Sequence, residues 1–125
     1  AYLTGALNPL SPEGQVETSR FLQIAMAAYD TLGMCFMASV SLLSPEAFEA
    51  VGKAVSARLG RLLEPEEFPF GLGRRVLKAE REFNRKAGFT KEDDRLPRFF
   101  YEEPLPPHNV VFSIRDEELD RVFDF

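Results

Sequence analysis

The order of apolar and polar residues along the chain predicts a succession of helices. Apolar residues recur at helical spacing over several stretches, and each stretch lies between residues that start or stop helices. Start signals stand at Ser11 and at Ser44, where proline and then glutamate follow the hydroxyl residue. We therefore expect an all-α fold, organised as a single irregular multi-helix domain over residues 1–125.

The expected helices cover residues 12–30, 34–43, 45–59 and 72–86, with a short helical turn at 64–68. Gly33, Gly60 and Gly88 follow three of them, and glycine ends helices because it adopts left-handed backbone angles. The helix at 72–86 should carry an apolar stripe made of Leu72, Val76, Ala79 and Phe83.

The segments at the two ends of the chain show no sustained period. Residues 1–10 contain the turn signal Asn8-Pro9 and are expected to form a connecting arm. Residues 89–115 are rich in proline and charge, with aromatic residues at 89, 99, 100 and 101. We expect an extended segment that wraps over a surface, anchored by its aromatic side chains, with a mobile tail as the alternative. Asp116 is expected to cap a last helical turn.

The most apolar stretch, residues 21–43, carries a single charge, that of Asp30. A buried carboxylate is costly unless something pairs with it, so an acid in this stretch predicts a partner. The stretch is also long enough to cross a bilayer, but an acid near its middle disfavours a transmembrane helix. A helix that is apolar on all sides is otherwise buried in a large protein body, which indicates that this chain is part of something bigger.

Charge and cysteine content exclude several classes of protein. A net charge of −5 disfavours nucleic acid or an anionic membrane surface as a partner, because both require a basic face. The single cysteine, Cys35, excludes an internal disulfide and fits a reducing, cytoplasmic compartment. It can supply at most one ligand to a zinc or iron–sulfur site, so the other ligands would come from other polypeptide. No signal peptide is evident at the start of the sequence.

Two motifs carry the candidate chemistry. The first places Asp30, Gly33, Met34 and Cys35 within six residues. The second begins with GRRV at 73–76 and continues with EREFNRKAGF at 80–89, DDRLPRF at 93–99 and EEPLP at 102–106. In this order and at this distance, the two motifs resemble the C-terminal domain of the tungsten-pterin aldehyde ferredoxin oxidoreductases. The resemblance runs from about residue 21 to the end of the chain.

The resemblance implies a larger enzyme that oxidises aldehydes to carboxylic acids and passes the electrons to ferredoxin. Its cofactors would be tungsten held by two molybdopterin-type pterins and one 4Fe–4S cluster. By this resemblance Cys35 is the fourth cluster ligand, Asp30 hydrogen-bonds a pterin, and Gly33 and Met34 pack against the cofactor. The acid–base residues would lie in upstream domains, so this chain alone is expected to hold no catalytic residue and to be colourless and inactive. The family's chains also continue beyond the position of Phe125.

Two positions depart from the family pattern. Met34 replaces a leucine, which conserves volume, and Lys86 replaces an arginine, so we assign no binding role to Lys86. Asn84 and Asp94 belong to the second motif, but capping and turn formation are their expected tasks. The only histidine, His108, is expected to be a surface residue.

A different class of protein is also consistent with the residues. A helical protein-interaction module without a cofactor could use the apolar face of residues 21–43 and the aromatic segment to dock onto a partner. On that interpretation Cys35 is a small buried apolar residue.

Overall fold

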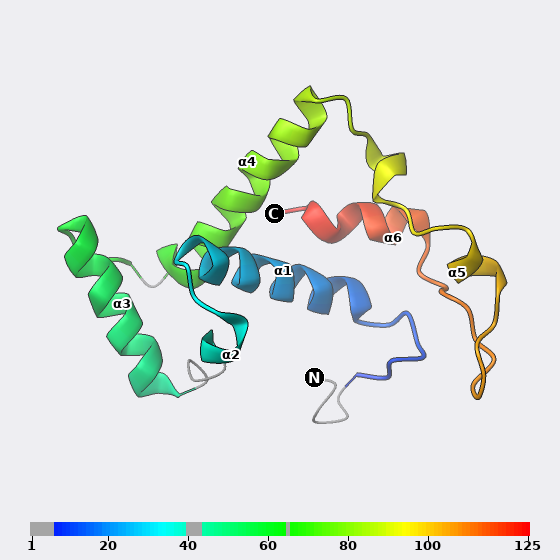
Figure 1. Cartoon of the computed structure of the whole chain (residues 1–125), viewed down its shortest axis with the longest axis horizontal. Coiled ribbons are helices and arrows are strands. Elements are labelled where there is room, and N and C mark those ends of the chain that lie inside the picture. Colours follow the sequence, from blue (N-terminus) through cyan, green and yellow to red (C-terminus); the bar gives the residue numbers. More distant parts are fainter. Residues whose placement is uncertain (1–6, 40–43, 65) are drawn as a thin grey trace. The chain divides into compact units, whose positions relative to one another are not determined.

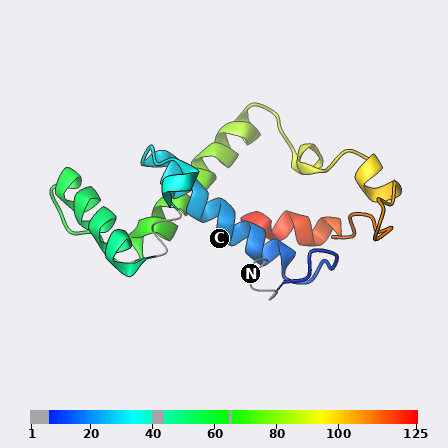
Figure 2. The same ribbon diagram turned by 60° about the horizontal axis from the view of Figure 1, so that its bottom comes forward.

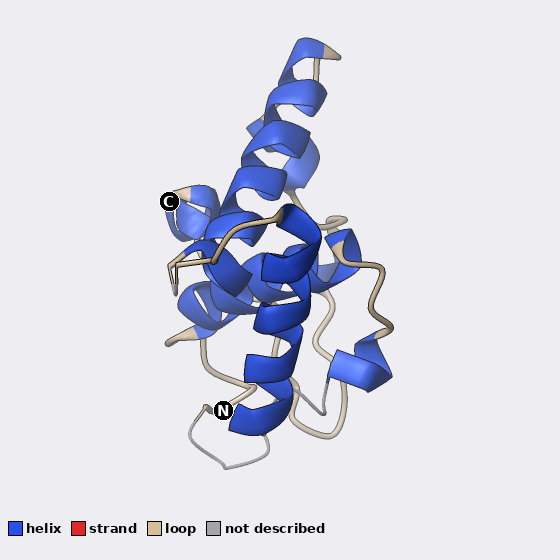
Figure 3. Ribbon diagram, turned by 90° about the vertical axis from the view of Figure 1, so that its left-hand side faces the viewer, coloured by secondary structure: helices blue, strands red, loops and turns tan. Residues whose placement is uncertain are grey.

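The computed structural model describes residues 7–39, 44–64 and 66–125. Helices are the regular elements of these ranges, and no strand occurs within them (Figure 3). The all-α fold is therefore confirmed. Most of the expected arm at residues 1–10, and residues 40–43 of the second expected helix, lie outside the described ranges.

The helices follow one another as Figure 1 shows. They are α1 (Gln15–Thr31), α2 (Phe36–Ser39), α3 (Pro45–Leu59), α4 (Leu72–Lys86), α5 (Phe99–Glu102) and α6 (Asp116–Asp120). Short helical turns lie at η2 (Glu67–Gly71), η3 (Lys91–Asp94) and η4 (Arg121–Phe123). No helix in the described ranges is both long enough and apolar enough to cross a membrane.

The predicted start of the first helix is wrong by three residues. The Ser11 hydroxyl accepts a hydrogen bond from the Glu13 backbone N–H at 3.3 Å, which forms a local turn and not a helix cap. Gly14 then adopts a positive φ of 72°, and its carbonyl accepts from the Thr18 N–H at 3.1 Å. Helix α1 consequently begins at Gln15.

Helix α3 begins and ends as predicted. The Ser44 hydroxyl accepts from the Ala47 backbone N–H at 3.4 Å, and Pro45 occupies the first helical position. At the other end Gly60 has φ 68°, and its N–H donates to the Ala57 carbonyl at 3.3 Å. The start and stop signals that the sequence carries are therefore the ones that the backbone uses.

The described chain forms two compact units, and each is presented by itself. Unit 1 comprises Ala1–Phe21 and Asn84–Phe125, and unit 2 comprises Leu22–Phe83. Unit 2 holds most of the buried apolar side chains, which are Ile24, Ala25, Ala28 and Phe68. Unit 1 contributes Val16 to the buried apolar side chains of the described residues.

Unit 2 depends on a close approach of α4 to α1. Gly73 on α4 is buried, and a Cβ placed on it would lie 1.9 Å from the carbonyl oxygen of Ile24. Because no side chain fits at that distance, only glycine allows the two backbones to come this near. The apolar stripe predicted for α4 is consequently wrong in part, since the helix buries Gly73 while Phe83 is 72% exposed.

Phe68 joins three elements of unit 2. Its ring centroid lies 6.3 Å from that of Tyr29 on α1, in an edge-to-face pair, and 5.6 Å from that of Phe48 on α3, in a stacked pair. Aromatic pairs of this kind add to the stabilisation that burial alone provides. Phe68 itself is 5% exposed and so belongs to the core. The helical turn expected at 64–68 is wrong in its bounds, since the turn η2 spans Glu67–Gly71.

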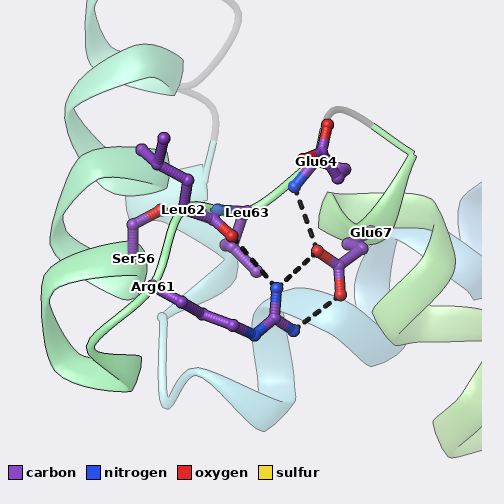
Figure 4. A network of polar contacts seen from close by, with 6 residues as sticks. All are labelled: Ser56, Arg61, Leu62, Leu63, Glu64 and Glu67. Atoms are coloured by element: carbon purple, nitrogen blue, oxygen red, sulfur yellow. Dashed lines mark hydrogen bonds and ion pairs between the residues drawn. The ribbon is translucent and has the colours of Figure 1, made fainter.

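The link between α3 and η2 is fixed by polar contacts around one carboxylate (Figure 4). The Arg61 guanidinium donates to both oxygens of Glu67, each at 2.7 Å, and also to the Leu62 carbonyl at 3.0 Å. Glu67 further accepts from the Glu64 N–H at 3.0 Å. These donors lower the pKa of Glu67 to about 2, because each of them favours the ionised carboxylate.

Charged and polar contacts join the two chain segments that make up unit 1. Arg20 donates to the backbone carbonyls of Val122, at 3.1 Å, and of Arg121. The Arg95 guanidinium lies 2.6 Å from Asp120 and 3.3 Å from Asp116, with both acids on α6. These contacts fasten α1 and the region of η3 to the last helices.

The aromatic segment of unit 1 contains two short helices, η3 and α5, joined by extended backbone. Leu105 and Val110 form an isolated antiparallel bridge, and the Phe112 N–H donates to the Phe100 carbonyl at 2.8 Å. The rings of Tyr101 and Phe112 meet edge to face, with centroids 5.4 Å apart. The segment is thus ordered by its own backbone and aromatic contacts.

Candidate functional site

The first motif lies at the C-terminal end of α1, where the chain turns towards α2 (Figure 2). The Gly33 N–H donates to the Asp30 carbonyl at 2.9 Å, and the Met34 N–H donates to the Tyr29 carbonyl at 3.0 Å. Gly33 has a φ of 70°, which is the left-handed conformation that such a helix end requires. The predicted helix break at Gly33 is therefore confirmed.

This turn leaves the thiol and the backbone of the first motif exposed to solvent. Cys35 follows it directly and is exposed, so the interpretation of this thiol as a buried apolar residue is wrong. Met34 is half-buried, and a Cβ added to Gly33 would have no atom within 4 Å. A group bound outside the chain can therefore reach both the Cys35 sulfur and the backbone before it.

Asp30 is also exposed, which corrects the expectation of a lone buried carboxylate. It stands two residues after Ala28, hence about 200° further round the helix, and Ala28 is the residue that α1 buries completely. The apolar composition of the stretch misled the prediction, because only one side of α1 is buried. Because the Asp30 carboxylate is not buried, it needs no partner within the chain. It can accept a hydrogen bond from a donor outside the chain.

An open hollow of about 470 Å³ lies between α1 and α4 within unit 2. Asp30 is part of its lining. The polar lining consists of Gln23, Asp30, Thr31 and Glu80, and the apolar lining includes Ala27 and Val76. No lysine or arginine is among the residues that line it. The hollow therefore presents hydrogen-bond acceptors and negative charge.

The hollow brings the two sequence motifs together. Asp30 belongs to the first motif, whereas Val76 and Glu80 belong to the second. Their helices are held at this distance by the contact of Gly73, the first residue of the second motif, with the backbone of Ile24. Part of the second motif therefore positions one wall of a surface that contains the motif aspartate.

The two carboxylates of the hollow have no partner within the described part of the chain. Neither Asp30 nor Glu80 makes a hydrogen bond or ion pair through its side chain to any described residue. By contrast, Glu67, Asp120 and Glu49 are all paired with basic residues, at 2.7, 2.6 and 2.6 Å respectively. The acids of the hollow are thus free to accept from something outside the chain.

A second hollow, of about 630 Å³, lies along α3 and the residues that follow it in unit 2. Its lining is mostly apolar and includes Phe48 and Phe68. Lys53 in this lining is paired with Glu49, and Arg61 is paired with Glu67. Three of the four charged side chains in its lining are paired, and Glu64 is the fourth, so this hollow offers little polar chemistry.

Sequence reasoning missed Gln23 and Glu80 as members of the site. A signal for Gln23 was present, because it precedes Ala27 and Asp30 by four and seven residues and so shares their side of the helix. Glu80 was quoted as part of the second motif, but only the crossing of α1 and α4 shows that it lines the same hollow as Asp30. The remaining residue of interest, His108, is exposed, as predicted.

The described residues of this chain fit the role of supplying one ligand to a metal cluster. Among the described residues, no three histidine, cysteine or acidic side chains gather closely enough to hold an ion by themselves. Cys35 is an exposed thiol, and thiolate is the ligand that iron–sulfur clusters take. An exposed thiol with open space beside it therefore fits a cluster whose other ligands come from elsewhere.

Within the described residues, the fold is all-helical, with one exposed thiol and an acidic hollow. Comparison with models of known protein families gives a match to aldehyde ferredoxin oxidoreductase, domains 2 & 3, over residues 3–124. The chain belongs to the aldehyde ferredoxin oxidoreductase family. Comparison with curated proteins and with solved structures gives no match.

Proposed function

We propose that this chain is the C-terminal part of a tungsten-pterin enzyme that oxidises aldehydes to carboxylic acids with ferredoxin as electron acceptor. The oxidation of an aldehyde with water to an acid releases two electrons and two protons, and the tungsten-pterin and 4Fe–4S groups supply the redox chemistry. The chain's own contribution is to hold these groups together with upstream domains of the same enzyme. No acid–base step is assigned to its residues.

The observation that carries the proposal is the exposed Cys35 immediately after the turn that ends α1. In this proposal the Cys35 thiolate is one ligand of the cluster. Asp30, exposed one turn earlier, accepts a hydrogen bond from a pterin N–H. The open space beside Gly33 allows the cofactor to approach the backbone there, next to Met34.

The ligand role is tested in the assembled enzyme, with this chain produced together with the upstream polypeptide. We expect Cys35→Ala to remove the cluster or convert it to a form with fewer irons, measured by iron per protein and by electron paramagnetic resonance. Met37→Ala is the matched control, because Met37 lies two residues further on, is 73% exposed and has no thiol. Unchanged iron and spectrum in Cys35→Ala would show that the ligand role is wrong.

The backbone approach at Gly33 is tested by comparing two glycines with the same geometry. Gly33 and Gly60 both end a helix at a positive φ, 70° and 68°, and at neither would a Cβ meet an atom within 4 Å. Alanine at either position should cost a similar free energy of unfolding, about 1 kcal/mol. Only Gly33→Ala should also lower the pterin and iron content of the assembled enzyme. Equal cofactor content in the two variants would contradict a close approach at Gly33.

The second candidate is an interaction module without a cofactor. It is favoured by the exposed apolar side chains directly after Cys35, since Phe36 is 63% and Met37 73% exposed. On this alternative, Phe36→Ala and Met37→Ala weaken assembly with the upstream polypeptide, and the complex contains neither iron nor pterin in any variant. Iron in the parent complex that disappears in Cys35→Ala excludes the alternative.

A further inference from the structure

One side of α4 carries a row of basic side chains. The row consists of four residues at intervals of four, three and four positions, which is the spacing of one side of an α-helix. We call it the basic stripe, and its members are Arg74, Lys78, Arg81 and Arg85. We infer that the basic stripe is a docking surface for a partner protein that presents a short row of carboxylates. The inference goes beyond the proposed function and does not depend on it.

The basic stripe lies away from the side of α4 that packs on α1. Gly73 contacts α1, and Lys78 follows it by five residues, which is about 140° round the helix. Arg74, Lys78 and Arg85 are exposed, and Arg81 is half-buried. The hollow between α1 and α4 has none of these four residues in its lining. The contact with α1 therefore leaves the stripe accessible to a partner.

Positive charge is concentrated on this helix although the chain is acidic. Helix α4 contains six of the fifteen lysine and arginine residues and two of the twenty acids, so it carries a net charge of +4. The whole chain carries −5, which leaves −9 for the residues outside α4. A basic surface on an acidic chain attracts and orients a partner of the opposite charge.

The two ends of the stripe are open to an outside carboxylate. Neither Arg74 nor Arg85 makes a side-chain hydrogen bond or ion pair to any described residue. By contrast, Arg61 and Arg95 are each paired with a carboxylate, at 2.7 and 2.6 Å. The two residues in the middle of the stripe interact within the chain and add charge to it. Because a guanidinium binds a carboxylate through two parallel hydrogen bonds, each end of the stripe can hold one acidic side chain of a partner.

A protein partner fits the stripe better than nucleic acid or a membrane. The stripe runs from Arg74 to Arg85, which is roughly 16 Å along the helix axis. Nucleic acids and anionic membranes extend far beyond this length and would be repelled by the acidic remainder of the chain. The stripe also contains no aromatic side chain that could stack on a base or enter a bilayer interface. A short row of carboxylates matches it in both length and sign.

The test uses the chain assembled with the upstream polypeptide, and two synthetic helical peptides as probes. Both peptides have the same composition with four glutamates. In the ordered peptide the glutamates follow intervals of four, three and four, and in the scrambled peptide they are spread round the helix. We expect the ordered peptide to bind about tenfold more tightly, measured by fluorescence anisotropy, and its affinity to fall as salt is added.

Charge reversal shows whether the stripe is the surface that binds. Arg74→Glu and Arg85→Glu should each weaken binding of the ordered peptide about tenfold or more. Arg58→Glu is the matched control, because Arg58 is an exposed arginine on α3 and its reversal changes the net charge equally. It should bind the peptide as the parent does. If a reversed charge prevents assembly, Arg74→Gln and Arg85→Gln replace the two variants, since glutamine is also a good helix former.

Four outcomes would overturn the inference. Equal binding of the two peptides would show that the order of the basic residues does not matter. An equal loss in Arg58→Glu would show a general effect of net charge. Tighter binding of a 20-base-pair DNA duplex or of phosphatidylserine vesicles would assign the stripe to a different class of partner. Binding by the free chain that disappears on assembly would show that the upstream polypeptide covers the stripe. None of these results bears on the cluster, which Cys35→Ala tests separately.

Discussion

Different kinds of contact stabilise the interior of each of the two units. Unit 2 depends on close packing, in which Gly73 allows the backbone of α4 to lie against Ile24 and Phe68 contacts rings on two helices. Unit 1 relies more on exposed and half-buried polar contacts, in which Arg20 binds backbone carbonyls and Arg95 binds two acids of α6, alongside ring pairs such as Tyr101 with Phe112. The difference predicts that a change of side-chain volume will damage unit 2 and that a change of salt or charge will damage unit 1.

The candidate site lies in the unit that depends on packing. Asp30, Cys35 and the hollow all belong to unit 2, and the wall of the hollow that carries Glu80 is positioned by the Gly73 contact. A site that must hold a cofactor in a fixed geometry benefits from such support, because packed helices are less easily displaced than salt-bridged segments. The contrast between the units therefore bears on function as well as on stability.

The largest effect is expected from Gly73→Ala. Its new Cβ would lie 1.9 Å from the Ile24 carbonyl oxygen, so α4 must move away from α1. We expect a loss of about 3 kcal/mol or more in the free energy of unfolding, measured by urea denaturation. Gly52→Ala on α3 is the control, since nothing lies within 4 Å of its Cβ, and it should gain about 0.5 to 1 kcal/mol. A mild effect of Gly73→Ala would show that packing at this point does not hold unit 2 together.

The next effect concerns the polar contacts of unit 1. Arg95→Ala removes the partner of Asp116 and Asp120, and it should speed hydrogen exchange in α6 while leaving exchange in α3 unchanged. Added salt should reproduce part of this effect in the parent protein, because it screens exposed ion pairs. Arg98→Ala is the control, as its pair with Glu102 is a highly exposed pair one turn apart on a helix. If salt or Arg95→Ala speeds hydrogen exchange equally in both units, the proposed difference between the units is wrong.

The helix ends could be predicted from the sequence, but the way the helices meet could not. Ser44, Gly60 and Gly88 act through hydrogen bonds to residues three or four positions away, so the local sequence contains the whole cause. The exposure of Asp30 and the burial of Gly73 depend on which side of α1 contacts α4. The contact between α1 and α4 forms between residues some fifty positions apart, so it cannot be predicted from the local sequence.

The same distinction applies to the candidate site. The first motif is local, so Gly33 and Cys35 could be placed just after the helix from the sequence. Glu80 could not be connected with Asp30, because only the crossing of two helices brings them to one hollow. Residues whose role depends on tertiary contact were thus the ones that sequence analysis missed.

Acid should weaken both units, through different residues. The Arg61 hydrogen bonds lower the pKa of Glu67 to about 2, and those from Arg95 and Lys91 lower the pKa of Asp120. Since a lowered pKa stabilises the folded state only while the acid is ionised, both contributions are complete above the ordinary pKa of these acids. They decrease as the pH falls below it, which for Glu67 means between about 4.5 and 2.

The acid effect can be assigned to each unit by substitution. Glu67→Gln should flatten the pH dependence of hydrogen exchange in unit 2, and Asp120→Asn should flatten that of unit 1, over the same fall in pH. Each variant should leave the profile of the other unit unchanged. If either substitution flattens both profiles, the two units do not respond to acid independently.

The smallest effect is expected from Tyr101→Phe in unit 1. The Tyr101 hydroxyl is buried and has no hydrogen-bond partner among the described residues, although its ring packs edge to face on Phe112. An unpaired buried hydroxyl destabilises a fold, so its removal should raise the free energy of unfolding by up to about 1 kcal/mol. Tyr29→Phe in unit 2 is the control for loss of a hydroxyl from a tyrosine that also contacts an aromatic ring. A clear loss of stability in Tyr101→Phe would mean that the hydroxyl does have a partner, and that unit 1 contains a buried polar contact in addition to its exposed ones.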